Sequence, residues 1–354
     1  MQQNFVSPNP YAAFKERLVP PSAASLHTQK VIDWLGANGA TYRLANFGIL
    51  LPEITVKGPI APAQNKNEEI SVHTISLSDN LVVSDANLAN LDGLSELRVI
   101  DLTNCKISPI GLAMLKGLVG LHTMYLSGID LTGFDFEQLA DSSRIQTLML
   151  NGCSISDEQL ISIIRLFPML RELGLSHARV TSASASKLDA LNLLTTLILD
   201  STNIDDESLT VIGNLTRLEV LDLSGTKLSG SNLSPIWSSK LLKGLGVGGI
   251  PVTDAAMDAV TNLRMLSAFD VRDTAVTAEA VRSFLANRPA VGLYVSPHLF
   301  GKHSQLEALL ELGPIRGEVT VDHRPLPPLA AIEAIQNGGS ITGLTWPIDP
   351  RRTS

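Results

Sequence analysis

Three glycines in the stretch GLGVGG, residues 244 to 249, have the spacing GxGxxG, which cradles the phosphates of a dinucleotide in some proteins. That chemistry needs the glycines in a turn between a strand and a helix, where backbone N–H groups can bind phosphate. Here Leu245 and Val247 alternate with glycines as the buried residues of a strand do. We therefore predict no nucleotide site and no cofactor, and we expect the glycines to leave a shallow trough on a sheet.

Histidines suggest two other kinds of chemistry. His298, His303 and His323 lie near the C-terminus, but they lack the HxxxH-type spacing of metal ligands. His177 directly follows Ser176, and neighbouring residues of a strand point to opposite faces, which is poor geometry for a nucleophile and its base. The sequence therefore predicts no metal site, no catalytic residues and no enzyme.

Carboxylates and a few large apolar side chains recur at positions that point away from the expected core. Tyr125, Met149 and Ile198 lie on a face where burial does not require them. An apolar centre with a polar rim is typical of protein-binding surfaces. We predict a partner-binding surface that consists of Asp101, Tyr125, Met149, Glu172, Ile198, Asp200, Asp222 and Asp270, and a protein partner with a basic surface. A glycosidase that uses two of these acids is an alternative.

These positions belong to a repeat of 24 residues, which is clear in LEVLDLSGTKLSG at residues 218 to 230. Ten copies start at residues 72, 97, 121, 145, 170, 194, 218, 242, 266 and 290, so two of the steps are 25 residues long. The fourth position holds Ile75, Ile100, Met124, Leu148, Leu173, Leu197, Leu221, Leu245, Phe269 and Leu293. The eleventh position holds Val82, Ile107, Leu131, Ile155, Val180, Ile204, Leu228, Val252, Val276 and Phe300. Both columns are wholly apolar in a chain that is 44% apolar, which predicts a solenoid of stacked repeats.

Each copy resembles the leucine-rich repeat, whose signature is LxxLxLxx(N/C/T)xL. The copy LTTLILDSTNIDDESLTVIGNLTR is similar to the pattern LxxLxLxxTxItDxxLxxLxxLxx of bacterial leucine-rich-repeat proteins and to cysteine-containing repeats. The resemblance extends from residue 72 to about residue 300. It implies an α/β fold, a curved (horseshoe) solenoid that binds proteins on a concave parallel sheet and has mostly helices on its convex side. The crossover rule for parallel strands predicts a right-handed solenoid.

The two ends of the chain depart from the repeat, as the caps of a solenoid must. We expect a flexible arm at residues 1–24, a cap of one helix and two strands at residues 25–71, and ten repeats at residues 72–313. GEVTV and ITGLTW keep strand spacing, so residues 314–354 are predicted to form a divergent eleventh repeat and a C-terminal cap. Gly133 and Gly230 predict less regular helices in two repeats.

Composition narrows the function further. A net charge of −8 argues against a nucleic-acid binder, and we find no apolar stretch long enough to span a membrane and no Sec signal peptide. Cys105 and Cys153 both occupy the ninth repeat position, about 10 Å apart by strand spacing, which is too far for a disulfide. We therefore expect both cysteines to be reduced and buried in a cytoplasmic protein.

The resulting prediction is a non-enzymatic protein-binding scaffold. Two alternatives stay open. One is a bacterial effector that is exported by a non-Sec route through residues 1–24 and binds host proteins. The other is a receptor that binds a small ligand or a carbohydrate along the glycine trough.

Overall fold

The structure, a computed structural model, describes the backbone of residues 23–46, 49–50, 54–55, 70–288, 290–296, 318–321, 324–326 and 341–345. It describes side chains at residues 28–40, 71–288 and 290–296. The predicted arm, apart from its last two residues, lies outside these ranges, as do His298, His303 and His323. The chain divides into two compact units, the first formed by Met1–Asp130 and Gln138–Ile145 and the second by Leu131–Glu137 and Gln146–Ser354.

The first unit contains the N-terminal cap and three parallel strands. Helix α1 spans Ala23–Ala37, and strand β1 (Thr41–Asn46) pairs antiparallel with the first repeat strand, β4 (Ile70–Ser76). The short strands β2 (Ile49–Leu50) and β3 (Ile54–Thr55) also pair antiparallel with β1, so three strands form where two were expected. Strands β4, β5 (Val99–Asp101) and β6 (Thr123–Tyr125) pair in parallel, in register one repeat apart.

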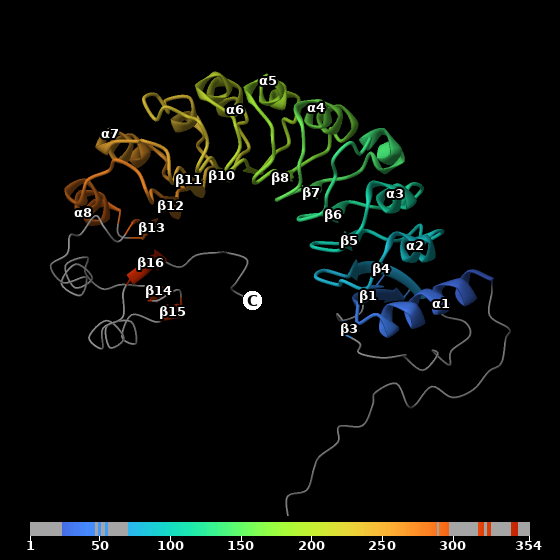
Figure 1. The fold of residues 1–354 in the computed structure, drawn as a ribbon. Coiled ribbons are helices and arrows are strands. Elements are labelled where there is room, and N and C mark those ends of the chain that lie inside the picture. The colour runs from blue at the N-terminus through green and yellow to red at the C-terminus, as the bar shows by residue number, and fades with distance from the viewer. Residues whose placement is uncertain are drawn as a thin grey trace, which may run out of the picture. The chain divides into compact units, whose positions relative to one another are not determined.

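The second unit contains seven parallel repeat strands. They are β7 (Thr147–Met149), β8 (Glu172–Gly174), β9 (Thr196–Ile198), β10 (Val220–Asp222), β11 (Gly244–Gly246), β12 (Ala268–Asp270) and β13 (Gly292–Tyr294). Each strand pairs with the next in register, so Leu173, Leu197, Leu221 and Leu245 are successive partners. Within this unit the strands lie on the inner side of the curve and the helices lie on the outer side (Figure 1).

The helical segments that join the strands are mostly short. They are α2 (Asp85–Leu88) and α3 (Pro109–Leu112) in the first unit, and α4 (Asp157–Leu166), α5 (Ser182–Ala185), α6 (Leu209–Gly213), α7 (Asp254–Ala259) and α8 (Ala278–Asn287) in the second. The repeats of Gly133 and Gly230, both with positive φ, have only 3-10 helix, at Phe136–Ser142 and Ile236–Ser238. This confirms the prediction of less regular helices there. No helix in the described ranges is both long enough and apolar enough to cross a membrane.

The C-terminal strands form a sheet of their own. Strand β14 (Glu318–Val321) pairs antiparallel with β15 (Arg324–Leu326) and with β16 (Ile341–Thr345). GEVTV and ITGLTW therefore contain strands, but their pairing corrects the prediction of an eleventh repeat, whose strand would run parallel to the others. Only two residues separate β14 from β15, and so short a connection joins antiparallel strands.

Burial along the strands follows the leucine pattern. The fourth-position residues Leu148, Leu173, Leu197 and Phe269 are fully buried, and the residues on either side of them point away from the core. The first repeat departs from the predicted register: Val82 is 79% exposed at the expected eleventh position, and Val83 is buried in its place. This repeat is one residue longer than most, so its core position moves along by one residue.

A left-handed turn follows each of the first nine repeat strands at the eighth position. The φ angle there lies between 55° and 75° at Asp79, Asn104, Gly128, Gly152, His177, Ser201, Gly225, Gly249 and Asp273. Glycine enters this region without steric cost, and Asn, Asp and His enter it more easily than most other residues. His177 therefore occupies a turn position.

Aspartates on the outer side link neighbouring repeats. Asp157 accepts hydrogen bonds from the backbone N of Thr181 at 2.8 Å and from its Oγ1 at 2.7 Å. Both groups belong to the next repeat, so one carboxylate holds the residue that caps the next helix. We call this contact the repeat clasp. It also forms between Asp85 and Ser108, between Asp206 and Ser229, and between Asp254 and Thr277.

Both cysteines are buried, and neither forms a disulfide, as predicted. Cys105 is 4% exposed and donates a hydrogen bond from Sγ to the backbone O of Leu77 at 2.9 Å. Burial, the largest of several causes, raises the pKa of its thiol. Cys153 is 1% exposed. Both therefore act as core residues of the repeat stack.

Candidate functional site: the outward face of the strands

The eight predicted site residues all lie in strands or directly after them, at positions that alternate with the buried core. Asp101 and Tyr125 belong to the first unit, and Met149, Glu172, Ile198, Asp200, Asp222 and Asp270 belong to the second. Within each unit the in-register pairing places these residues in rows across the sheet.

In the first unit, Asp101 and Tyr125 are direct partners on β5 and β6. Asp101 accepts hydrogen bonds from Ser76 Oγ and from the backbone N of Thr103, both at 3.0 Å. Tyr125 is half-buried. The carboxylate of Asp101 therefore stabilises the ends of two strands, whatever else it binds.

In the second unit, Met149 is buried, which corrects the prediction that it is an exposed anchor. Only 9% of its surface is exposed. Its partner on β8 is Gly174, and a Cβ added to Gly174 would lie 2.7 Å from Met149 Sδ and 2.7 Å from Asn151 Oδ1. The Met149 side chain therefore occupies the space that a side chain on β8 would fill. Glu172, on the same strand as Gly174, is half-buried.

Asp222 fills part of the predicted glycine trough. Its partner on β11 is Gly246, and a Cβ added to Gly246 would collide with the Asp222 carboxylate. The pKa of Asp222 is raised, mainly by burial and also by the negative charges of Asp200 and Asp270. Hydrogen bonds from Ser224 lower the pKa but do not outweigh these effects. The expected empty trough is therefore wrong at Gly246, because the neighbouring carboxylate covers the glycine.

Ile198 and Asp200 lie one strand away from Asp222. Ile198 is half-buried, and its partners in register are Gly174 on β8 and Asp222 on β10. The carboxylate of Asp200 accepts a hydrogen bond from the hydroxyl of Ser176. Ser176 therefore pairs with an aspartate on the next repeat and not with His177, which lies in the turn.

Asp270 is already neutralised by a neighbour. Arg272 forms an ion pair with it, at 2.5 Å between Nη2 and Oδ2, and a second hydrogen bond from Nε at 2.9 Å. The Arg272 guanidinium also lies over the Tyr294 ring, 5.9 Å from its centroid. Arg272 and Tyr294 were not among the predicted site residues, although both stand in the same repeat columns as the residues that were.

The chemistry of this face is that of an acidic surface. Asp200 and Asp222 are on neighbouring repeats, and neither forms an ion pair with a Lys or Arg within the described ranges. Those ranges also contain no group of three or more His, Cys, Asp or Glu residues that could hold a metal ion. Two carboxylates beside an isoleucine are suited to a cationic group that carries an apolar stem.

Comparison with known proteins agrees with the repeat architecture. The Leucine Rich Repeat family model matches residues 217–239, which are the last residue of the sixth repeat and most of the seventh. No curated protein gives a significant sequence match.

Three solved structures are similar to the chain. Internalin C2 of Listeria monocytogenes is 22% identical, with 64% of this chain and 81% of that chain covered and a TM-score of 0.44. An internalin (inlF) of the same organism is 18% identical, with 63% and 79% covered and a TM-score of 0.37. The ectodomain of the Arabidopsis receptor kinase HAESA, solved with a peptide hormone, is 19% identical, with 58% and 39% covered and a TM-score of 0.42. The period, the in-register parallel strands and the family match at residues 217–239 together show that the chain folds as a stack of leucine-rich repeats.

Proposed function

We propose that the second unit binds a protein partner on the outward face of its strands, at Ile198, Asp200 and Asp222, and that it does so without catalysis. The observation that carries this proposal is the pair of carboxylates on adjacent repeats, which have no cationic partner within the described ranges and stand beside a half-buried isoleucine. The sheet positions all three side chains, and folding does not require Ile198 to lie on this face.

The partner is expected to present a Lys or Arg side chain. Burial of Asp222 disfavours its charged form, and the nearby charges of Asp200 and Asp270 disfavour it further. Arg272 forms an ion pair with Asp270, whereas Asp200 and Asp222 have no ion-pair partner within the described ranges. A cation from a partner would relieve this repulsion, so the complex should form more slowly as salt is added.

A protein partner fits this face better than a small ligand. Asp222 and Met149 cover the glycines at 246 and 174, so these two glycines do not form the empty trough that the small-ligand alternative requires. Small molecules bind in concave pockets that bury most of their surface. Proteins bind flatter surfaces that have an apolar centre and a charged rim.

Site-specific photo-crosslinking in the native cells tests this proposal. A photo-reactive residue at Thr196, on β9, should link the protein to its partner. The same residue at Thr210, exposed on α6 on the outer side, should not. A specific adduct formed only from Thr210 would place the binding surface elsewhere.

A further inference from the structure

A second surface of the second unit lies on the edge where each helical segment returns to the next strand. The chain reverses there in a tight turn with two residues at its tip. These turns are closed by backbone hydrogen bonds from Leu170, Leu194, Leu218, Leu242 and Leu266 to the residues three positions earlier. We call residues 168–169, 192–193, 216–217, 240–241 and 264–265 the turn tips.

Three turn tips expose large apolar side chains. Met169 is 45% exposed, Leu241 is 46% exposed and Met265 is 52% exposed. In each case the next residue is a buried leucine, so the apolar tip is not needed to fill the core. Backbone hydrogen bonds from Lys243 to Glu219 and from Ser267 to Lys243 link successive turns, which places the tips side by side along one edge.

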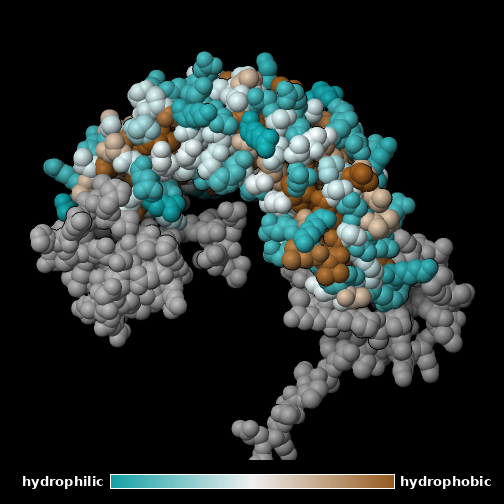
Figure 2. All heavy atoms as spheres, viewed as in Figure 1, coloured by the Kyte–Doolittle hydropathy of each residue, from teal (hydrophilic) through white to brown (hydrophobic). Residues whose placement is uncertain are grey.

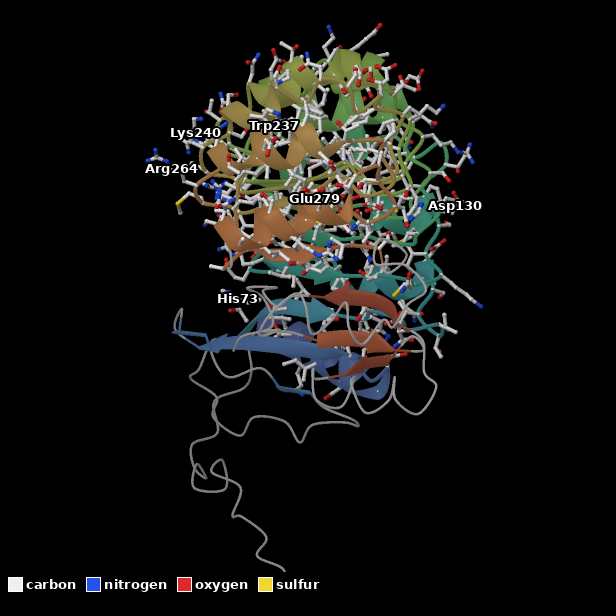
Figure 3. The ribbon with its side chains drawn as sticks, turned by 90° about the vertical axis from the view of Figure 1, so that its left-hand side faces the viewer. His73, Asp130, Trp237, Lys240, Arg264 and Glu279 are labelled. Carbon is white, nitrogen blue, oxygen red and sulfur yellow. The ribbon has the colours of Figure 1, made fainter. Side chains whose placement is uncertain are left out.

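Cations dominate the same edge. The turn tips and the second residue of each following repeat contain Arg171, Arg217, Lys240, Lys243 and Arg264, but only one acid, Glu219, which pairs with Lys243 at 2.6 Å. This contrasts with the net charge of −8 for the whole chain. Lys240 and Arg264 project from this edge in Figure 3, and Lys240 Nζ donates a hydrogen bond to the backbone O of Trp237 at 3.4 Å. Cations at the C-terminal ends of helices are favourable for helix stability, but that effect does not explain the exposed Met and Leu residues.

We infer that this edge of the second unit binds an anionic lipid surface. Apolar tips that protrude among cations can enter the headgroup region, while the cations are attracted to acidic lipids. The edge of a stack of repeats presents its tips side by side, so several of them can reach a flat surface together.

Co-sedimentation of the full chain with lipid vesicles tests this inference. Vesicles of phosphatidylcholine with phosphatidylserine should bind the protein, and binding should fall with added salt. The same vesicles without phosphatidylserine should bind it much more weakly. The variant K240E/R264E should lose about tenfold or more of its binding, since each cation near the membrane surface contributes to attraction. The variant L241S/M265S should also bind more weakly, because its polar tips no longer insert into the headgroup region of the vesicles.

Two exposed cations on the opposite edge provide the matched control. The variant R179E/K227E makes the same change in net charge at Arg179 and Lys227, and it should sediment like the parent protein. An equal loss in this control would show that only total charge matters and would overturn the inference. Failure of the parent protein to bind phosphatidylserine vesicles would also overturn it. Neither result bears on the strand-face proposal, which concerns different residues.

Discussion

Asp222 lies across Gly246, its direct partner on the next repeat strand, where a Cβ would collide with the Asp222 carboxylate. The aspartate is therefore held against the sheet, where burial raises its pKa and the charges of Asp200 and Asp270 raise it further against hydrogen bonds from Ser224. A buried acid whose charged form is disfavoured in this way reduces the stability of the fold at neutral pH. Positions where stability is reduced in this way are often functional sites.

The substitution Asp222→Asn should stabilise the protein by on the order of 1 kcal/mol at neutral pH, because it removes a disfavoured charge and keeps an oxygen for the Ser224 N–H. Folding raises the pKa of Asp222, so the folded protein binds this proton more tightly than the unfolded chain. The ionised Asp222 carboxylate therefore destabilises the fold more and more as the pH rises from the ordinary carboxyl pKa to the raised value. Urea unfolding of both proteins at neutral and acidic pH should show the difference shrinking in acid.

Asp270→Asn provides the control for this prediction. Its carboxylate already has Arg272 as an ion-pair partner, so its removal should not stabilise the protein. If both substitutions stabilise it equally, general charge reduction explains the effect.

Met149→Ser should cost about 1.5–3 kcal/mol of unfolding free energy, because the side chain is 9% exposed and packs over Gly174. Ile198→Ser, at the same repeat position, should cost clearly less, because Ile198 is only half-buried. Thermal unfolding of the two variants measures this contrast. Equal losses would mean that Met149 does not pack against β8 as described.

Asp157→Ala should destabilise the protein by about 2 kcal/mol through loss of the repeat clasp with Thr181 and of the hydrogen bond from Ser184 Oγ. Burial raises the pKa of Asp157, but hydrogen bonds from Ser184 and Thr181 outweigh it and lower the pKa overall. The contribution of Asp157 is therefore present above the ordinary carboxyl pKa and is lost as the pH falls through the lowered value. Urea unfolding at several pH values should follow this dependence.

Asp206→Ala removes the same clasp at an exposed pair, Asp206 and Ser229, and should cost less. The comparison separates the effect of burial from the effect of the contact itself. A larger loss at Asp206 than at Asp157 would contradict the ranking.

The sequence predicted the features that are set by the residue at a single repeat position and do not depend on the neighbouring repeat. These include the buried leucines, the alternation along each strand, the irregular helices near Gly133 and Gly230, and the burial of both cysteines. The C-terminal pairing was missed because strand spacing alone does not distinguish a parallel from an antiparallel partner. In the first repeat, the extra residue allowed either Val82 or Val83 to be the core residue.

The site residues were harder to predict, because their exposure depends on the neighbouring repeat. Met149 was expected on the surface, but Gly174 on the next strand leaves room for it to fold down. The same relationship lets Asp222 cover Gly246. In both cases the signal is a glycine in the same column one repeat later, and it is visible only when two adjacent rows are read together.

The central claim is that Asp200 and Asp222 bind a basic partner, and the direct measurement is the dissociation constant of the crosslinked partner, once purified. Binding should weaken about tenfold or more, or at least ~1.4 kcal/mol, in the variant D200N/D222N. The variant E207Q/D258N makes the same charge change on the outer side of the second unit, at the exposed residues Glu207 and Asp258, and should bind like the parent. Because Asp222→Asn is expected to stabilise the fold, unfolding would not explain a loss of affinity. Equal dissociation constants for the parent and D200N/D222N would contradict the account.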